Sequence, residues 1–439
     1  MPNALMLETM SPELLTVAER AKREPEGQFH ALAHLIDVPA LSRAYRRLRK
    51  KAAVGVDGLT KEQYGQELER NLQDLHHRLK TQRYRHQPIL RGYVPKGQGR
   101  HRPIGISVTE DKVVQGALRE VLEAIYETEF TESSYGFRPN RSAHDALRTL
   151  DRAGQGGEMN WIVEADIVSY FDSVDRTKLK EMIQKRVADG AFMRLIGKCL
   201  NVGVLDGEGY SEPDVGTAQG SVLSPLLGNI YLHFALDLWV ESEVKPHLRG
   251  KSVFVRYCDD FMFGFERQDD AECVMMRLRK QMGMYGLTLH PDKTRLVSFG
   301  RPSKEQQAGK GPGSVDFLGF TLYWKRSRDG RWILAFKTRS ARLTRAIRSV
   351  YDRCRRQRHR SVKEQHTTLV RHVRGHMNYF GVNGNIRSLH LLLVQVQRAW
   401  FKWLRRRSQR TRLTWERYQD LLRDFPLPRP RIVVQIWGR

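Results

Sequence analysis

Cysteine is scarce in this sequence, with four residues among 439 and no C-x-x-C pair. Zinc modules and disulfide frameworks both need paired or regularly spaced cysteines, so neither is predicted. Isolated cysteines are typical of proteins in a reducing compartment. We therefore expect a cytoplasmic protein.

Long apolar runs are also lacking. The first residues, MPNALMLETMSPELL, contain no basic segment leading into an apolar one, so no signal peptide is expected. The most apolar window, 221–240, is interrupted by Pro225, Asn229, His233 and Asp237. Such a window predicts a buried helix and no membrane span.

Acidic residues are depleted in the last quarter of the chain. Residues 321–439 contain 30 lysines and arginines but six aspartates and glutamates, whereas residues 1–320 contain 45 and 43. Almost the whole net charge of +26 therefore lies in the C-terminal quarter. A basic block of this size, mostly arginine, predicts a polyanionic partner such as nucleic acid. A generically basic, soluble surface is the alternative.

Residues 253–265, VFVRYCDDFMFGF, combine two apolar runs with an acidic break. The β-branched and aromatic residues on both sides of Cys258 predict a hairpin of two buried strands. Asp259 and Asp260 at its tip repel each other and would be costly in an apolar sheet without a cation. Paired carboxylates on a rigid turn suit a hard divalent ion such as Mg²⁺. A solvated turn between ordinary strands is the alternative.

A second acidic stretch, WIVEADIVSYFD at 161–172, favours the metal interpretation. Its apolar residues predict a strand with Asp166 at its end. An enzyme that transfers nucleotides with two metal ions needs carboxylates from separate strands, which hold the ions roughly 3.5–4 Å apart. One aspartate from this strand and an aspartate pair from the hairpin would supply them. Asp166 and the YCDD sequence resemble the first catalytic aspartate and the Tyr-x-Asp-Asp box in the palm of reverse transcriptases.

The resemblance implies a catalytic centre of three aspartates, Asp166, Asp259 and Asp260. Two Mg²⁺ ions would be held by Asp166, Asp259 and the main-chain carbonyl of Ile167, with Asp260 supporting the site. In such a site the ions activate a primer 3′-hydroxyl and stabilise the pyrophosphate leaving group.

Residues 91–106, RGYVPKGQGRHRPIGI, predict a second hairpin with basic residues at its turn. Arginine forks match the oxygens of a triphosphate, and the family has its fingers hairpin at this place. By this resemblance, Lys96 and Arg102 contact the phosphates of the incoming nucleotide. A basic hairpin that touches only the template backbone is the alternative.

Four further residues are assigned to the nucleotide by the same resemblance. Phe171 corresponds to an aromatic that excludes a 2′-hydroxyl, although a core phenylalanine fits the same periodicity. The stretch GTAQGSVLSPLLGNIYL is similar to the family's pocket motif Q-G-x-x-x-S-P-x-L-x-N, which brings in Gln219 and Gly220. Lys293, in GLTLHPDKTRLV, would neutralise triphosphate charge.

The block SSYGFRPNRSAHDAL, residues 133–147, mixes rings for base stacking with guanidinium groups for phosphates. It resembles the family's template-contacting Y-G-F-R-P motif. This resemblance assigns Tyr135, Phe137, Arg138 and Arg141 to template or other RNA.

The last part of the chain is predicted to begin with a strand at 317–324, which resembles the family's primer grip, and to continue as helices. The helices are expected at 338–359, 361–379, 386–407 and 414–423. In the family this region is the thumb, or maturase domain, which grips the duplex and binds intron RNA. His372 and His376 have the spacing of a helical metal site. No third ligand accompanies them, so a structural or RNA-facing role is favoured.

The expected fold is α+β, a right-hand polymerase with fingers and an antiparallel palm sheet, followed by an α-helical thumb. The predicted boundaries are an N-terminal extension at 1–60, fingers at 61–160, palm at 161–325, helical thumb at 326–425 and a C-terminal tail at 426–439. Fingers and palm elements are expected to interleave.

The resemblance is to group II intron-encoded reverse transcriptases of the compact type that lacks an endonuclease domain. It implies an RNA-directed DNA polymerase whose partners are an RNA template, a DNA or RNA primer, dNTPs and structured intron RNA. Association with the bacterial nucleoid or a ribonucleoprotein would follow. Two other functions fit the same residues: a non-enzymatic RNA-binding maturase, and a host-adopted reverse transcriptase in defence or DNA repair.

Overall fold

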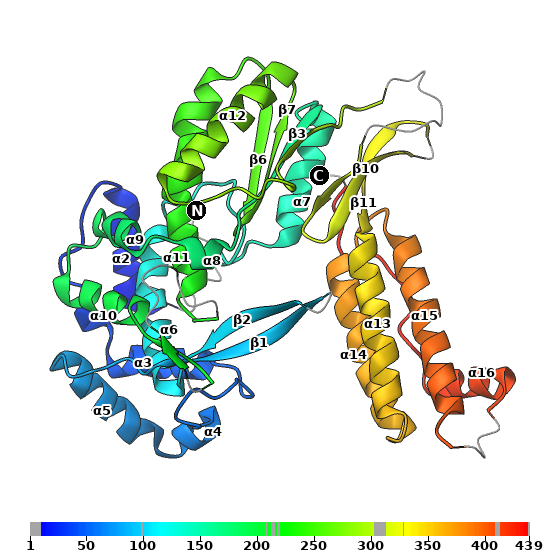
Figure 1. Ribbon diagram of the computed structural model, residues 1–439, viewed down its shortest axis with the longest axis horizontal. Helices are drawn as coiled ribbons and strands as arrows, with labels where there is room; N and C mark the ends of the chain where they lie inside the picture. Colours follow the sequence, from blue (N-terminus) through cyan, green and yellow to red (C-terminus); the bar gives the residue numbers. More distant parts are fainter. Residues whose placement is uncertain are drawn as a thin grey trace.

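The computed structural model describes residues 10–97, 100–207, 209–211, 216, 220–302, 313–327, 329–408 and 413–437. Figure 1 shows a sheet covered by helices, a long hairpin below it, and a helical bundle beyond the end of the hairpin. The bundle is formed by the C-terminal part of the chain, drawn from yellow to red. Helices and strands are mixed without regular alternation, as expected for an α+β fold.

The central sheet has four antiparallel strands in the order β6-β7-β3-β8. They are β3 (Trp161–Asp166), β6 (Ser252–Tyr257), β7 (Asp260–Phe265) and β8 (Arg295–Ser298). The hairpin predicted at 253–265 is confirmed as β6 and β7. Because successive side chains of a strand point to opposite faces, the sheet contributes to two cores. Val163 enters one hydrophobic cluster and Ile162 enters another.

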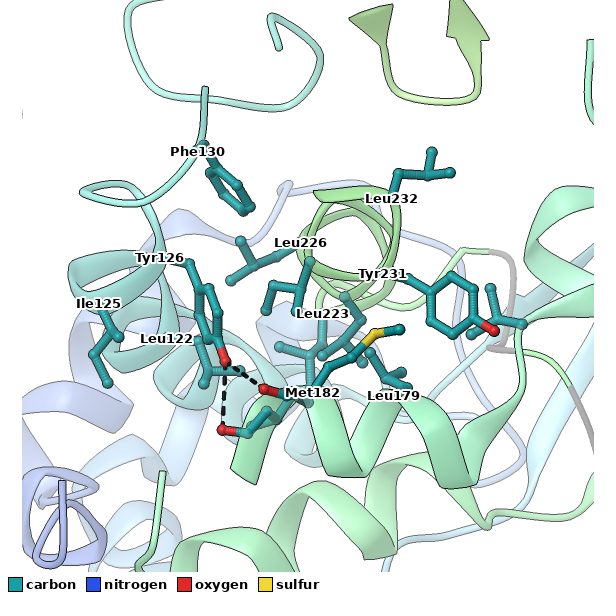
Figure 2. Packing of buried hydrophobic residues seen from close by; sticks show 14 of the residues in the cluster. Leu122, Ile125, Tyr126, Phe130, Leu179, Met182, Leu223, Leu226, Tyr231 and Leu232 are labelled. Carbon is teal, nitrogen blue, oxygen red and sulfur yellow. Dashed lines mark hydrogen bonds between the residues drawn. The ribbon is translucent and has the colours of Figure 1, made fainter. Parts of the chain in front are cut away.

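Helices cover the first face of the sheet and form the larger core with it. They are α6 (Thr109–Tyr126), α8 (Tyr170–Ser173), α9 (Arg176–Gln184), α10 (Gly190–Leu200), α11 (Ser224–Leu232) and α12 (Gln268–Met284). Figure 2 shows Leu122, Met182 and Leu226 packed together where α6, α9 and α11 meet. Tyr126 lies between them, and its hydroxyl donates to the carbonyls of Met182 and Ile183 at 3.3 and 3.4 Å. These hydrogen bonds satisfy the hydroxyl of a tyrosine side chain that is fully buried.

The apolar window at 221–240 forms α11 and its continuation, which confirms the prediction of a buried helix. After Leu232 the helix widens into two π-helical segments, η3 (His233–Asp237) and η4 (Val240–Val244), and ends in the 3₁₀ turn η5 (Lys245–His247). Widened turns of this kind are frequent at functional sites. Asp237, one of the interruptions noted in the sequence, is fully buried here.

The N-terminal part carries short helices and a mixed sheet. The helices are α2 (Pro12–Arg23), α3 (Val38–Arg47), α4 (Lys61–Tyr64) and α5 (Leu68–Lys80), with 3₁₀ turns η1 (Ala33–Leu35) and η2 (Gly65–Glu67). The predicted hairpin at 91–106 is confirmed, because β1 (Ile89–Gly97) pairs antiparallel with β2 (Arg100–Ile106). β1 also pairs in parallel with β4 (Val204–Asp206), which continues into β5 (Gly209–Ser211).

The second face of the central sheet is covered by α7 (Ala143–Gly156) and a three-stranded sheet. Its strands are β9 (Val315–Phe317), β10 (Phe320–Arg326) and β11 (Trp332–Thr338), in the order β11-β10-β9. The strand predicted at 317–324 is found in part, because a turn at Leu318 and Gly319 separates the end of β9 from the start of β10. The end of the chain returns to this core, where Ile436 is buried and Trp437 donates to the carbonyl of Leu334 at 2.8 Å.

The four predicted C-terminal helices are all present. They are α13 (Ser340–Gln357), α14 (Val362–Phe380), α15 (Ile386–Arg405) and α16 (Trp415–Asp424). Their apolar sides share a third core, centred on the fully buried Trp400, whose indole donates to Gln365 at 3.1 Å. Most arginines of α13 and α14 are exposed, which gives the bundle a basic surface.

Candidate active site

Asp166, Asp259 and Asp260 come together at one end of the central sheet. Asp166 ends β3, Asp260 begins β7, and the two are direct partners in the antiparallel register. Both lie on the same face of the sheet, because partners in register point to the same side. Asp259 occupies the two-residue turn between β6 and β7, next to Asp260. The structure therefore juxtaposes the three aspartates predicted from stretches that are about ninety residues apart.

The turn that carries Asp259 has an unusual backbone. Cys258 has φ of +60°, a left-handed conformation in the position where a two-residue hairpin turn normally has glycine. Gly136 lies directly against it, and a Cβ at Gly136 would stand 2.4 Å from the Cys258 nitrogen. The glycine of the Y-G-F-R-P block is therefore needed for a close approach of backbone to the acidic turn.

The charges of the site favour a bound cation. Burial, with the neighbouring charges of Asp259 and Asp166, raises the pKa of Asp260 to about 7. Asp166 forms an ion pair with Lys293, which sets one positive charge against three carboxyl groups. Asp260 nevertheless keeps an exposed side, so an ion could reach it. A divalent cation would relieve the remaining repulsion.

The oxygen donors fit magnesium. Carboxylates and a main-chain carbonyl are the ligands that Mg²⁺ prefers. The Asp166 carbonyl accepts from the His290 amide at 2.7 Å, and the Val168 amide donates to Thr288 at 2.9 Å. Neighbouring carbonyls of an extended segment alternate in direction, so the carbonyl of Ile167 faces away from residues 288–290. Within the described ranges, no three His, Cys, Asp or Glu side chains already form a metal cage. Because Asp166 forms an ion pair with Lys293 in this structure, a metal ion would compete with Lys293 for that carboxylate.

Phe171 lies beside this site, in the short helix α8. Its ring is partly buried and stands 5.2 Å from the ring of Tyr170, whose hydroxyl donates to the Gly228 carbonyl at 2.6 Å. A Cβ at Gly228 would meet both rings at 3.2 Å. The ring therefore packs against the core and also keeps an accessible part, so the structure accommodates both interpretations of this residue.

The structure describes two of the residues predicted to bind the nucleotide near the hairpin, Gly220 and Arg102. Gly220 has φ of +115°, and a Cβ there would stand 2.6 Å from the carbonyl of Gly105 in β2. The loop thus lies against the hairpin that carries Arg102, whose side chain is exposed. Lys96 is in β1, but its side chain lies outside the described residues, as does Gln219.

One residue that sequence reasoning missed supports this loop. Gln115, fully buried in α6, accepts from the Ser221 hydroxyl and the Val222 amide, both at 3.1 Å. Its amide nitrogen lies 2.9 Å from the ring of His86. In the sequence, Gln115 could have been noticed as a glutamine among the apolar positions of a predicted helix.

The four residues assigned to template or RNA differ in their surroundings. Arg138 is buried and donates to Glu127 and to the carbonyls of Thr131 and Ser134. Tyr135 is buried with its hydroxyl 2.8 Å from that of Thr149, and Arg141 pairs with Glu132 at 2.5 Å. Phe137 is 51% exposed, with φ of +57°. Of the four, Phe137 is thus the side chain that is presented outward.

Phe137 lines a groove of about 1080 Å³ between the N-terminal helices and the hairpin. The same groove is lined by Gly220 and by basic residues such as Arg47, Lys51 and Arg119. Two glutamates, Glu120 and Glu123, also line it and form ion pairs with Arg47 and Arg119. A ring on the wall of a basic groove is a typical arrangement for stacking a base of a single strand.

His372 and His376 lie on α14 with buried ring nitrogens that have no hydrogen-bond partner among the described residues. Burial, together with His372, lowers the pKa of His376 to about 4. The preference for a structural or RNA-facing role over a metal site, made from the sequence, stays a prediction. In the part of the chain that the structure describes, no helix is long and apolar enough to cross a membrane.

Comparison with known proteins supports this description. Residues 94–322 match the family described as reverse transcriptase (RNA-dependent DNA polymerase). Protein YkfC of Escherichia coli K12 is 33% identical over 350 residues, which cover 72% of this chain and 88% of YkfC. The group II intron-encoded protein LtrA of Lactococcus lactis is 38% identical over 198 residues, 45% of this chain and 33% of LtrA. Nuclear intron maturase 2 of Arabidopsis thaliana is 28% identical over 180 residues, 32% of this chain and 24% of the maturase.

A family match over more than half of the chain, on a structure with three aspartates at the end of an antiparallel sheet, defines a polymerase of the palm-and-fingers fold. The chain belongs to the reverse transcriptase family, and within it to the group II intron-type reverse transcriptases and maturases. Members of this family generally use divalent metal ions.

Proposed function

We propose that this protein copies RNA into DNA at the site formed by Asp166, Asp259 and Asp260. The observation that carries the proposal is the register pairing of Asp166 with Asp260 next to the Asp259 turn. An RNA-binding protein without polymerase activity would have no need of three carboxylates held together against their repulsion.

Each residue of the site would have its own role in the reaction. Asp166, Asp259 and the Ile167 carbonyl would hold two Mg²⁺ ions, with Asp260 as support, and the bound ions would supply Lewis-acid activation of the primer hydroxyl. Lys293, released from Asp166, would then face the triphosphate. Arg102 and Lys96 would bind phosphate oxygens from the hairpin, Gln219 and Gly220 would bound the nucleotide, and Phe171 would exclude a 2′-hydroxyl.

The remaining parts would handle nucleic acid. We assign the sheet and its covering helices to the palm, the hairpin region to the fingers, and the bundle of α13–α16 to a thumb. The segment 10–60 would be the extension that lines the template groove. The basic bundle also supports a second role, binding of structured intron RNA to assist splicing and mobility, which is compatible with polymerase activity.

The test is primer extension on an RNA template with Mg²⁺ and dNTPs. Asp259→Asn keeps the shape of the side chain but removes its charge, so we expect a rate at least about a hundredfold below wild type. Asp269→Asn, on the exposed start of α12, removes the same charge elsewhere and should retain the wild-type rate. Equal rates in all three proteins, or no extension by wild type, would reject the proposed function.

A further inference from the structure

A buried ionic network lies directly behind the catalytic turn. Arg256 in β6, Asp237 in η3 and Asn229 in α11 are all fully buried. The Arg256 guanidinium holds Asp237 with two bonds, Nε to Oδ1 at 2.7 Å and Nη2 to Oδ2 at 2.5 Å. Its Nη1 donates to the side-chain oxygen of Asn229 at 2.9 Å.

The same Nη1 also donates to the main-chain carbonyl of Cys258, at 3.2 Å. Cys258 is the residue with the left-handed backbone, and Asp259 follows it. A hydrogen bond to this carbonyl fixes the peptide unit that joins the two residues. The buried guanidinium therefore restrains the peptide unit that leads into Asp259.

The network extends to the Y-G-F-R-P block. The Asn229 amide donates to the Gly136 carbonyl at 2.6 Å, and Gly136 is the glycine that lies against Cys258. The Arg256 backbone pairs with the same segment, because its amide donates to Ser133 and its carbonyl accepts from Tyr135, both at 2.8 Å. Three distant stretches of the chain are thus joined at the acidic turn.

Fold stability alone explains this network poorly. A buried ion pair costs desolvation free energy, and apolar residues of similar volume often replace such pairs without loss of stability. What apolar residues cannot supply is a planar fork of donors that reaches a carboxylate, an amide and a carbonyl at once. Lysine cannot supply it either, since its donors lie on a single nitrogen.

We propose that Arg256 is a positioning residue for the polymerase reaction, which holds the Cys258–Asp259 peptide in its strained conformation while Asp237 and Asn229 orient the guanidinium. This inference rests on the proposed function, since it concerns the rate of the same reaction. It makes no demand on substrate binding, because Arg256 is sealed from the surface.

The test compares Arg256→Lys with Arg186→Lys. Arg186 is a similarly buried arginine, paired with Glu129 at 2.8 Å away from the acidic turn, so both variants disturb one buried ion pair. We expect Arg256→Lys to lower kcat about tenfold or more, since small misplacements of a reacting group have effects of this order. KM for dNTP should stay within about twofold, and half-maximal rate should require several times more Mg²⁺. Arg186→Lys should change none of these quantities beyond about twofold.

A rescue variant separates positioning from folding. Glycine adopts φ of +60° without strain, so adding Cys258→Gly to Arg256→Lys should recover part of kcat, by about threefold or more. Should Arg256→Lys not fold, Asn229→Ala, which breaks the link to Gly136 but leaves the ion pair, must show the same loss of kcat at constant KM. Wild-type kcat in the folded Arg256→Lys or Asn229→Ala protein, or equal losses in Arg186→Lys, would overturn the inference. A wild-type protein without activity would overturn the proposed function instead.

Discussion

Single residues in this protein are placed where function and stability conflict. Asp260 is held beside Asp259 and Asp166 at a pKa of about 7, and Cys258 has a backbone conformation that favours glycine. Both features cost free energy in the folded protein, and both lie within the acidic turn. Strain of this kind persists where surrounding residues determine the geometry, here Arg256 and Gly136.

Buried histidines make the stability of the protein depend on pH. Burial lowers the pKa of His233 to about 4, with Asp237 opposing this shift and Arg256 and Arg138 adding to it. Below about pH 6.5 the unfolded chain binds a proton that the folded protein excludes down to about pH 4. The contribution of neutral His233 to the free energy of unfolding is thus fully present above pH 6.5 and is lost as the pH falls toward 4.

The substitution His233→Phe should remove this pH-dependent part of the free energy of unfolding. The ring keeps its contact with Phe130, at 5.6 Å in the wild type, but can no longer take up a proton. Between pH 7 and pH 4.5 we expect the wild type to lose about 2–3 kcal/mol more free energy of unfolding than the variant. Chemical denaturation at the two pH values measures this difference. The control is His390→Phe at an exposed position, which should lose as much free energy of unfolding between the two pH values as the wild type. If His233→Phe also loses as much as the wild type, His233 is not the source of the pH dependence.

At the scale of elements, one hydrogen bond joins the C-terminal bundle to a turn beside the acidic site. The turn between β9 and β10 contains Leu318 at φ of +50° and Gly319 at +83°. The hydroxyl of Tyr379 in α14 donates to the Leu318 carbonyl at 2.9 Å. A hydrogen bond from the Leu318 backbone opposes the rise in the pKa of Asp260. The position of α14 is thereby linked to a residue of the site.

Tyr379→Phe removes only this hydroxyl. The hydrogen bond is worth about 1 kcal/mol, so if the turn controls Asp260 we expect kcat for primer extension to fall about fivefold. Tyr418→Phe is the matched control, since that phenol donates to the Gln397 carbonyl at 3.0 Å inside the same bundle. The measurement is the single-turnover rate of primer extension by the two variants at saturating dNTP. Equal rates would mean that the link is structural only.

The elements that could be predicted from sequence are those with strong local signals. The acidic hairpin, the β1–β2 hairpin and the four bundle helices follow from alternation or helical periodicity, and each is found. The parallel pairing of β1 with β4 could not be predicted, because it joins residues more than a hundred positions apart. Arg138 and Tyr135 illustrate the same limit at a site. Their residue types suit nucleic acid, but tertiary contacts give them internal partners.

At the scale of the whole molecule, the basic quarter of the chain is not a separable appendage. It includes β10 and β11, and residues such as Leu322 and Phe336 fill the core on the second face of the central sheet. The final residues also return to this core through Ile436. Deleting 321–439 would therefore expose that core, so the role of the basic charge is better tested by substitutions on the bundle surface.

Removing charge from the bundle surface should weaken RNA binding in a salt-dependent way. Each bound phosphate releases counterions, so the log–log slope of affinity against salt changes by about 0.7–0.9 for every phosphate that is no longer bound. The substitutions are Arg348→Gln, Arg356→Gln and Arg371→Gln, at exposed positions of α13 and α14. If all three arginines bind phosphates, the negative slope should shrink by about two to three. Binding isotherms on one structured RNA at several salt concentrations measure this slope.

The matched control removes the same charge at the other end of the molecule. Arg249, Arg267 and Arg279 are exposed around α12, which Figure 1 shows far from the bundle. Their replacement by glutamine changes the net charge equally but should leave the slope within about 0.5 of wild type, because arginines that bind no phosphate release no counterions from the RNA. Equal reductions in both triple variants would mean that RNA senses the total charge of the protein. A reduction confined to the α13–α14 variant would locate the phosphate-binding arginines on the bundle.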